Sequence, residues 1–355
     1  MIDAVRTLAR GFDAGERARL GGFYGFIAGL HIVGWVMLLS QAAEHPELLG
    51  LGALAYSFGL RHAFDADHIS AIDNITRKLL QQGRRPVGVG FFFSLGHSSV
   101  VLLIALALGF AVKSIVDSVV DDGGQLRELG ALIGTSVSGC FLLLIGLLNL
   151  MILVEIVRIY RRMQHGEYDR DALEQQLATG GLMTRLFRWL FRLVDSSWQM
   201  YPIGFVFGLG FDTASEVALL AISAGAASHG LPLVAVLSLP LIFAAGMTLM
   251  DTTDGAFMAK CYAWAFSSPI RKLFYNLTIT GLSVFIALFV GGVEVLQVLT
   301  QRLGLSGGLW DMIGDFDLSQ LGFIIVGAFV VTWIVAFVVF KLRRVDERWA
   351  TLVEG

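Results

Sequence analysis

Eight apolar segments follow one another along the chain, and each is long enough to cross a lipid bilayer as a helix. A hydrocarbon core about 30 Å thick is spanned by about 20 apolar residues. Inside that core every backbone N–H and C=O must be satisfied within the chain, which favours helices. Charged residues make up 15% of the chain and the mean hydropathy is +0.71, whereas soluble domains contain roughly 25% charged residues. We therefore expect an all-α, polytopic membrane protein with eight transmembrane helices.

The expected spans are 21–42, 47–80, 86–112, 129–157, 201–226, 231–258, 273–299 and 321–340. They divide the chain into a charged N-terminal segment (1–20), helices one to four (21–157), a basic loop (158–200), helices five to eight (201–340) and a tail (341–355). The second segment is longer than one crossing requires. Either its polar end extends past the bilayer or its helix is broken.

The basic residues indicate on which side of the membrane the loops lie. If both termini and the loops after spans two, four and six are cytoplasmic, that side holds 22 of the 26 Lys and Arg residues. The opposite side holds three, Lys113, Arg127 and Arg302, and Arg61 lies within a span. Cytoplasmic loops of membrane proteins are enriched in Lys and Arg, so we expect both termini in the cytoplasm.

The second span contains an unusual group of ionisable side chains, Arg61, His62, Asp65, Asp67 and His68. A charged residue at the centre of a spanning helix costs about 2.5 to 3.5 kcal/mol on insertion scales, so such residues are functional by default. The alternative is a structural polar network in which Arg61 neutralises Asp65 and holds helices together.

Helical geometry limits how the two histidines of this group can act. In a straight helix, His62 and His68 are about 240° apart around the axis and about 9 Å apart along it. They can bind one ion together only if the helix is broken between them. Otherwise they serve different steps of a path.

Other spans carry polar residues at a similar depth. His31 lies in the first span, His97 in the third, Asp212 and Glu216 in the fifth, and Asp251 and Asp254 in the sixth. Imidazole with carboxylate suits a borderline divalent ion such as Ni²⁺, Co²⁺ or Zn²⁺, whereas Mg²⁺ and Ca²⁺ prefer oxygen ligands. We interpret Asp73 and Asn74 as the solvated end of the second span.

Short matches between the two halves indicate an internal repeat. The segment 64–66 resembles 211–213, and 93–98 resembles 243–248, in spans that run in opposite directions. This is the pattern of an inverted-topology repeat, in which a transporter binds its substrate near the midplane. Short Gly-rich matches also arise between unrelated membrane helices.

Residues His62 to His68 fit a His-x4-Asp-His signature, and the similarity extends over 61–77, 93–98, 209–216 and 246–255. In these segments the chain resembles the nickel/cobalt transporter family of secondary permeases. The resemblance implies a bacterial inner-membrane protein that takes up Ni²⁺ and/or Co²⁺ with high affinity, the ion being its substrate and not a cofactor. It also implies that His62, Asp67 and His68 are essential for transport. It associates His31 with metal preference, in favour of accepting Co²⁺ as well as Ni²⁺.

We accordingly interpret His62 and His68 as metal ligands, with Asp65 or Asp67 as a further ligand or as a group that orients them. His31 and His97 would complete or gate the site. The remaining residues that we place along the transport path, or behind the ligands, are Arg61, Asp212, Glu216, Asp251 and Asp254.

Two other functions remain open at this point. A metal exporter of the related bacterial type would carry a His-rich cytoplasmic loop, and loop 158–200 contains a single histidine, His165. A membrane-embedded metallohydrolase would activate water on a bound metal, but the chain has no His-Glu-x-x-His motif. The expected partners are the metal ion and the lipid bilayer; we expect no nucleic acid and no obligatory protein partner, and the protein is not expected to be an enzyme.

Overall fold

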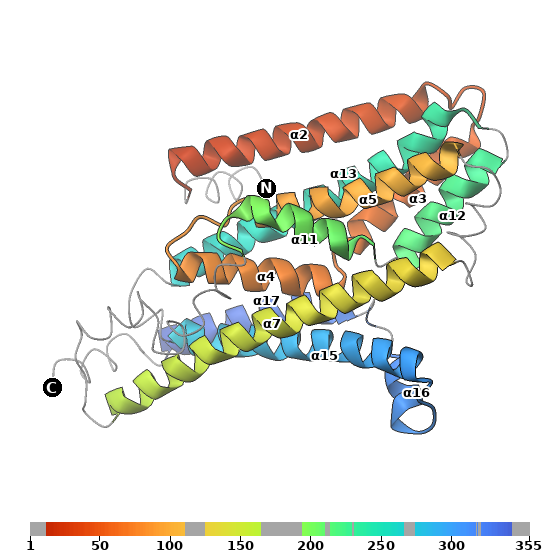
Figure 1. Ribbon diagram of the computed structural model, residues 1–355. Helices are drawn as coiled ribbons and strands as arrows, with labels where there is room; N and C mark the ends of the chain where they lie inside the picture. The colour runs from red at the N-terminus through yellow and green to blue at the C-terminus, as the bar shows by residue number, and fades with distance from the viewer. Residues whose placement is uncertain are drawn as a thin grey trace.

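The computed structural model describes residues 12–110, 125–164, 194–209, 214–228, 231–265, 274–316, 318 and 321–342. Over these residues the chain is helical and has no strand, which confirms the all-α expectation. The helices that are long and apolar enough to cross a membrane are Ala14–Leu39, Val89–Ala107, Leu233–Ala265, Leu277–Leu303 and Leu321–Leu342. Figure 1 shows the helices side by side, with α2 along one edge and α15 and α16 along the other.

The first long helix, α2 (Ala14–Leu39), begins before the expected span, because its start is well capped. The Asp13 side chain accepts a hydrogen bond from the backbone N–H of Glu16 (2.8 Å), and the Glu16 side chain accepts one from the N–H of Asp13 (3.0 Å). Such a capping box satisfies two otherwise unpaired helix N–H groups. The charged N-terminal turns therefore continue directly into the apolar helix.

The second span consists of two helices, α3 (Glu47–His62) and α4 (Ala66–Gln81). Between them the chain makes a tight turn, in which Phe64 N–H donates to the Arg61 carbonyl and Asp65 N–H donates to the His62 carbonyl, both at 2.9 Å. Asp65 is extended and begins the new helix. The broken-helix alternative is therefore the correct one for this segment.

Helix α4 lies in the interior of the bundle and contacts α5, α7, α13, α15 and α17 (Figure 1). Its polar residues are enclosed along with its apolar ones: Asp73, Asn74 and Arg77 are each 0% exposed. The interpretation of Asp73 and Asn74 as a solvated helix end is therefore wrong. Surrounding helices cover all faces of α4, so its polar groups must find partners inside the protein.

The remaining elements are α5 (Val89–Phe110), α7 (Gln125–Gln164), η1 (Ser197–Gln199), α11 (Met200–Phe207), α12 (Ala214–Ser228), α13 (Leu233–Ala265), η2 (Asn276–Thr280), α15 (Gly281–Leu303), α16 (Leu309–Gly314) and α17 (Leu321–Leu342). The fifth expected span, 201–226, is not one helix: α11 ends at Phe207, a turn follows at Gly208 and Leu209, and α12 begins at Ala214. A broken helix thus occurs in each half of the chain.

Helix α3 crosses α13 at very short range, through a glycine on each helix. A Cβ atom at Gly59 would overlap the backbone carbonyl of Phe243, and one at Gly246 would lie 3.1 Å from the carbonyl oxygen of Tyr56. Small residues allow membrane helices to approach this closely, since their backbones are then in contact.

Helix α11 crosses α5 in the same manner. A Cβ atom at Gly204 would overlap the carbonyl of Phe93, and one at Gly96 would overlap the carbonyl of Tyr201. The two crossings use the same residue types, a Tyr-x-x-Gly on the broken helix and a Phe-x-x-Gly on the long one. They hold the broken helices of the two halves against α13 and α5.

We predict that Gly204→Ala prevents the α11–α5 contact, because the added methyl group has no space beside the Phe93 carbonyl. Overpacking costs typically 1 to 3 kcal/mol, occasionally more. The measurement is the yield and thermal midpoint of the detergent-solubilised protein. Gly29→Ala in α2 is the matched control, because nothing lies within 4 Å of its Cβ position. Equal stability of the two variants would contradict the predicted contact.

Candidate metal-binding site

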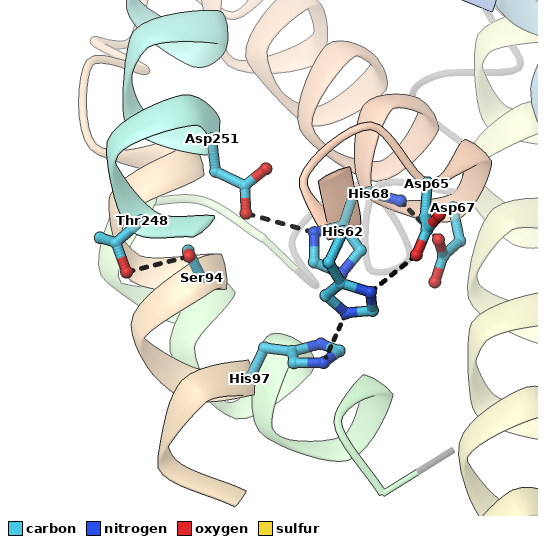
Figure 2. A network of polar contacts seen from close by, with 8 residues as sticks. All are labelled: His62, Asp65, Asp67, His68, Ser94, His97, Thr248 and Asp251. Carbon is cyan, nitrogen blue, oxygen red and sulfur yellow. Dashed lines mark hydrogen bonds and ion pairs between the residues drawn. The ribbon is translucent and has the colours of Figure 1, made fainter. Parts of the chain in front are cut away.

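Three histidines from three helices meet inside the bundle. His62 is the last residue of α3, His68 lies in the first turn of α4, and His97 lies in α5. Each is at most 2% exposed, and one potential ligand nitrogen of each lies within 4.8 Å of the others. Figure 2 shows the rings turned toward one another. The break between α3 and α4 creates this group, because it places His62 and His68 on separate helices.

His62 is held from both sides. Its Nδ1 lies 2.7 Å from Asp65 Oδ2, and its Nε2 lies 3.0 Å from His97 Nε2. Two nitrogens that bind one first-row divalent ion at about 2.1 Å, at right angles, lie about 3.0 Å apart. The His62–His97 spacing therefore suits an ion bound by both Nε2 atoms. Without an ion, one of these nitrogens donates its hydrogen to the other.

His68 presents one nitrogen to a carboxylate and leaves the other available. Its Nδ1 lies 3.2 Å from Asp251 Oδ2, whereas its buried Nε2 has no hydrogen-bond partner. Metal-binding histidines commonly donate one N–H to a carboxylate, which fixes the ring orientation and raises the basicity of the other nitrogen. Asp65 and Asp251 stand in this relation to His62 and His68 respectively.

Asp65 and Asp67 place negative charge beside the histidines (Figure 2). Asp65 is 3% exposed, and Asp67 Oδ1 accepts a hydrogen bond from the backbone N–H of His68 at 2.9 Å. Asp65 and Asp67 lie at the N-terminus of α4, where the helix dipole is positive. Their carboxylates offset this partial positive charge, which would otherwise repel a cation.

A hydrogen bond ties α5 to α13 beside the histidines. Ser94 Oγ donates to Thr248 Oγ1 at 3.1 Å, one turn before His97 on α5 and one turn before Asp251 on α13. Together with the glycine contacts, this bond fixes the helices that carry the third histidine and the carboxylate behind His68. The site is thus assembled from four helices.

His31 lies outside the group of three. Its Nδ1 is 2.8 Å from the Ile27 carbonyl oxygen and its Nε2 is 3.2 Å from the Tyr56 hydroxyl. Because a carbonyl oxygen can only accept, Nδ1 carries the hydrogen and a neutral His31 accepts from Tyr56 at Nε2. Both ring nitrogens are engaged, and the contact reaches α3 six residues before His62.

The other expected path residues have different positions. Arg61 is half-buried in the last turn of α3, next to His62. Asp254 lies one turn after Asp251 on α13, with a buried Oδ2 that has no hydrogen-bond partner. Asp212 lies outside the described residues. Glu216 belongs to α12, but its side chain is also outside the described part of the chain.

The structure adds a second buried polar layer next to the histidines, which the sequence reasoning missed. The Tyr262 hydroxyl donates to Asp73 Oδ1 at 2.5 Å, and Asn74 Oδ1 accepts from Arg77 Nη2 at 2.7 Å and from Asn149 Nδ2 at 2.8 Å. This layer connects α4 to α13 and α7.

A signal for this layer exists in the sequence. Ser70, Asp73, Asn74 and Arg77 are spaced i, i+3, i+4 and i+7, which places them on one face of a helix. A polar face on a membrane-spanning helix can contact polar side chains of neighbouring helices inside the bundle, just as it can contact water. In this protein the face contacts other helices and is buried, so the prediction that it is solvated is wrong.

We predict that Tyr262→Phe lowers the free energy of unfolding by about 1 to 3 kcal/mol, because it removes a donor from a buried carboxylate. The measurement is chemical or thermal unfolding in detergent. The control is Tyr24→Phe, whose hydroxyl bonds Thr253 at 3.0 Å in an exposed position. An equally small effect of both substitutions would show that Asp73 does not depend on Tyr262.

Comparison with known proteins identifies one family model and several relatives of this chain. A family model described as a high-affinity nickel-transport protein, NicO, matches residues 48–339. The chain is 50% identical over 347 residues to the nickel transporter NicT of Mycobacterium tuberculosis, covering 96% of this chain and 93% of that protein. It is 45% identical over 320 residues to the high-affinity nickel-transport protein NixA of Helicobacter pylori 26695, covering 88% and 94%. It is 43% identical over 326 residues to the cobalt transport protein NhlF of Rhodococcus rhodochrous, covering 90% and 91%. No solved structure matches the chain significantly.

Proposed function

This chain belongs to the NicO family of high-affinity nickel-transport proteins, and we propose that it imports Ni²⁺ by binding the ion at the three-histidine site. It is a transporter and not an enzyme, and nickel is its substrate. The observation that carries the proposal is the convergence of His62, His68 and His97 in the buried interior, with carboxylates behind two of them. Neutral imidazole is a favourable ligand for Ni²⁺.

We assign the ligands to His62, His68 and His97. Asp65 and Asp251 hold two of the rings, and their charge compensates part of that of the ion. Asp67 adds a third carboxylate from the first turn of α4, where it can serve as a ligand or as compensating charge. Helix α3 ends at the site, so the negative end of its dipole also favours a cation there.

The same ligands suit Co²⁺, since imidazole does not discriminate strongly between neighbouring divalent ions. One relative is named a cobalt transport protein. We therefore propose that the chain transports Co²⁺ as well as Ni²⁺. His31 influences the preference from outside the group, through its contact with Tyr56 on α3.

We further propose eight spans in the inner membrane of a bacterium, arranged as an inverted repeat with both termini and loop 158–200 in the cytoplasm. The distribution of Lys and Arg supports this topology. The repeat is supported by the broken helix in each half and by the paired glycine crossings of α3 with α13 and of α11 with α5. Transporters built in this way bind substrate where discontinuous helices meet.

The charge of the ion favours the inward direction that we propose. An inside-negative potential favours inward movement of a divalent cation by about 4.6 kcal/mol per 100 mV. Asp251 contacts His68, and Asp254 lies one turn closer to the C-terminal end of α13. We propose that this end of α13 faces the cytoplasm, so that the two carboxylates mark the inward part of the path. Asp212, Glu216 and Arg61 remain proposed members of the path on sequence grounds.

We predict that His62→Ala or His68→Ala abolishes uptake of radioactive Ni²⁺ into cells, with the protein still present in the membrane. Each substitution removes one of three proposed ligands from a buried site. His45→Ala is the control, because His45 lies in the connection between α2 and α3 and its Nδ1 is 3.4 Å from the carboxylate of the exposed Glu47. Near-normal uptake by either variant would overturn the ligand assignment, and nickel resistance with lowered accumulation in wild-type cells would indicate export.

We predict that His31→Asn changes the ratio of Ni²⁺ to Co²⁺ uptake more than it changes total uptake. Asparagine is shorter than histidine and cannot preserve the contacts with both Ile27 and Tyr56. The measurement is competitive uptake of both ions at nanomolar concentration, with wild type alongside. An unchanged ratio would remove His31 from any selectivity role.

A further inference from the structure

A basic pocket lies at one end of the bundle, separate from the histidine site. It has a volume of about 600 Å³, and its walls come from the start of α2, the turn between α4 and α5, the start of α5 and η1. The lining side chains that matter here are Arg19, Phe23, Arg84, Arg85, Phe92 and Trp198. The pocket thus combines three guanidinium groups with three aromatic rings.

The arginines leave the pocket positively charged. Arg84 Nη1 donates to the Asp195 carbonyl at 3.0 Å, and its Nη2 lies 3.6 Å from the Asp195 carboxylate. Arg85 forms an ion pair with Asp13 at 2.7 Å. Arg19 is exposed and has no ion pair among the described residues. The two acids, Asp13 and Asp195, offset two of the three arginines, so one positive charge is left over, on Arg19.

The aromatic wall continues into the exposed apolar face of α2. Phe23 stacks on Phe91 at 4.3 Å and meets Phe92 edge-on at 5.6 Å. One turn further, Phe26 is 47% exposed, and the exposed apolar side of α2 continues beyond it to Val36. Across the pocket, Trp198 is 60% exposed. The pocket therefore lies where the charged end of α2 changes to its apolar span, which is the level of the lipid headgroups.

We infer that this pocket binds the phosphate of an anionic phospholipid, with an acyl chain along the exposed face of α2. Guanidinium groups match phosphate oxygens in geometry and charge. Tryptophan is enriched at the membrane interface, and basic pockets between spanning helices on the cytoplasmic side bind anionic headgroups. A bound lipid would connect α2 to the α4–α5 turn. The inference does not depend on the metal site.

The test is thermal unfolding of the full-length protein in detergent, with added phosphatidylglycerol or phosphatidylcholine. We expect phosphatidylglycerol to raise the midpoint and phosphatidylcholine to have little effect. Arg19→Ala should weaken the apparent affinity for phosphatidylglycerol about tenfold, since a charge-assisted hydrogen bond contributes about 1.5 kcal/mol or more. Arg17→Ala is the matched control, because Arg17 is exposed on the same helix but does not line the pocket.

Three outcomes decide the inference. Equal loss of the effect in Arg17→Ala and Arg19→Ala would overturn it in favour of a general surface attraction. An equal rise in midpoint with inorganic phosphate alone would show that the pocket binds free phosphate and not a lipid. A phosphatidylglycerol effect that persists in His62→Ala, together with its loss in Arg19→Ala, would support the lipid site independently of nickel binding.

Discussion

The turn between His62 and Ala66 is the constraint on which the rest of the site depends. A continuous helix would hold His62 and His68 about 9 Å apart along its axis and on different faces. The turn instead places His62 at the C-terminus of α3 and His68 in the first turn of α4, with ring centres 4.6 Å apart. Asp65 begins the second helix and also contacts His62 Nδ1. The residue that precedes the second helix therefore also orients the ring of His62.

The break has a consequence for α4 as a whole. The helix turns into the interior, where α5, α7, α13, α15 and α17 surround it, and its polar residues lose contact with water. A buried polar group costs free energy unless it is hydrogen-bonded. The bonds of Tyr262 to Asp73 and of Asn149 to Asn74 meet part of this requirement. The polar layer thus holds α4 in place, with the histidine site at the helix's N-terminal end.

Close contacts between helices position the two residues of the site that come from outside the second span, His97 and Asp251. His97 lies on α5 and Asp251 on α13. These two helices are joined by the hydrogen bond between Ser94 and Thr248, which are 154 residues apart in sequence. Their backbones are in contact with other helices at Gly90, Gly96 and Gly246. Such short distances leave little freedom for a helix to slide or rotate. This rigidity preserves the spacing between nitrogens from different helices, on which the proposed binding of an ion would depend.

The sequence by itself determined the helical class, the membrane setting and the two histidines of the second span that we propose as ligands. The length of an apolar segment and the cost of burying a charge depend on neighbouring residues alone. The signature from His62 to His68 is one contiguous stretch, so it too can be recognised without knowing how the helices pack. Helical geometry also showed that His62 and His68 can bind one ion together only if the helix between them is broken.

Only the tertiary structure decided that the helix is broken, that His97 and not His31 joins the pair, and that Asp251 stands behind His68. Each of these depends on how helices distant in sequence cross, and the depth of a residue in the membrane does not say which way its side chain faces. For the same reason, Asp73 and Asn74 could be taken for a solvated end until the surrounding helices were seen.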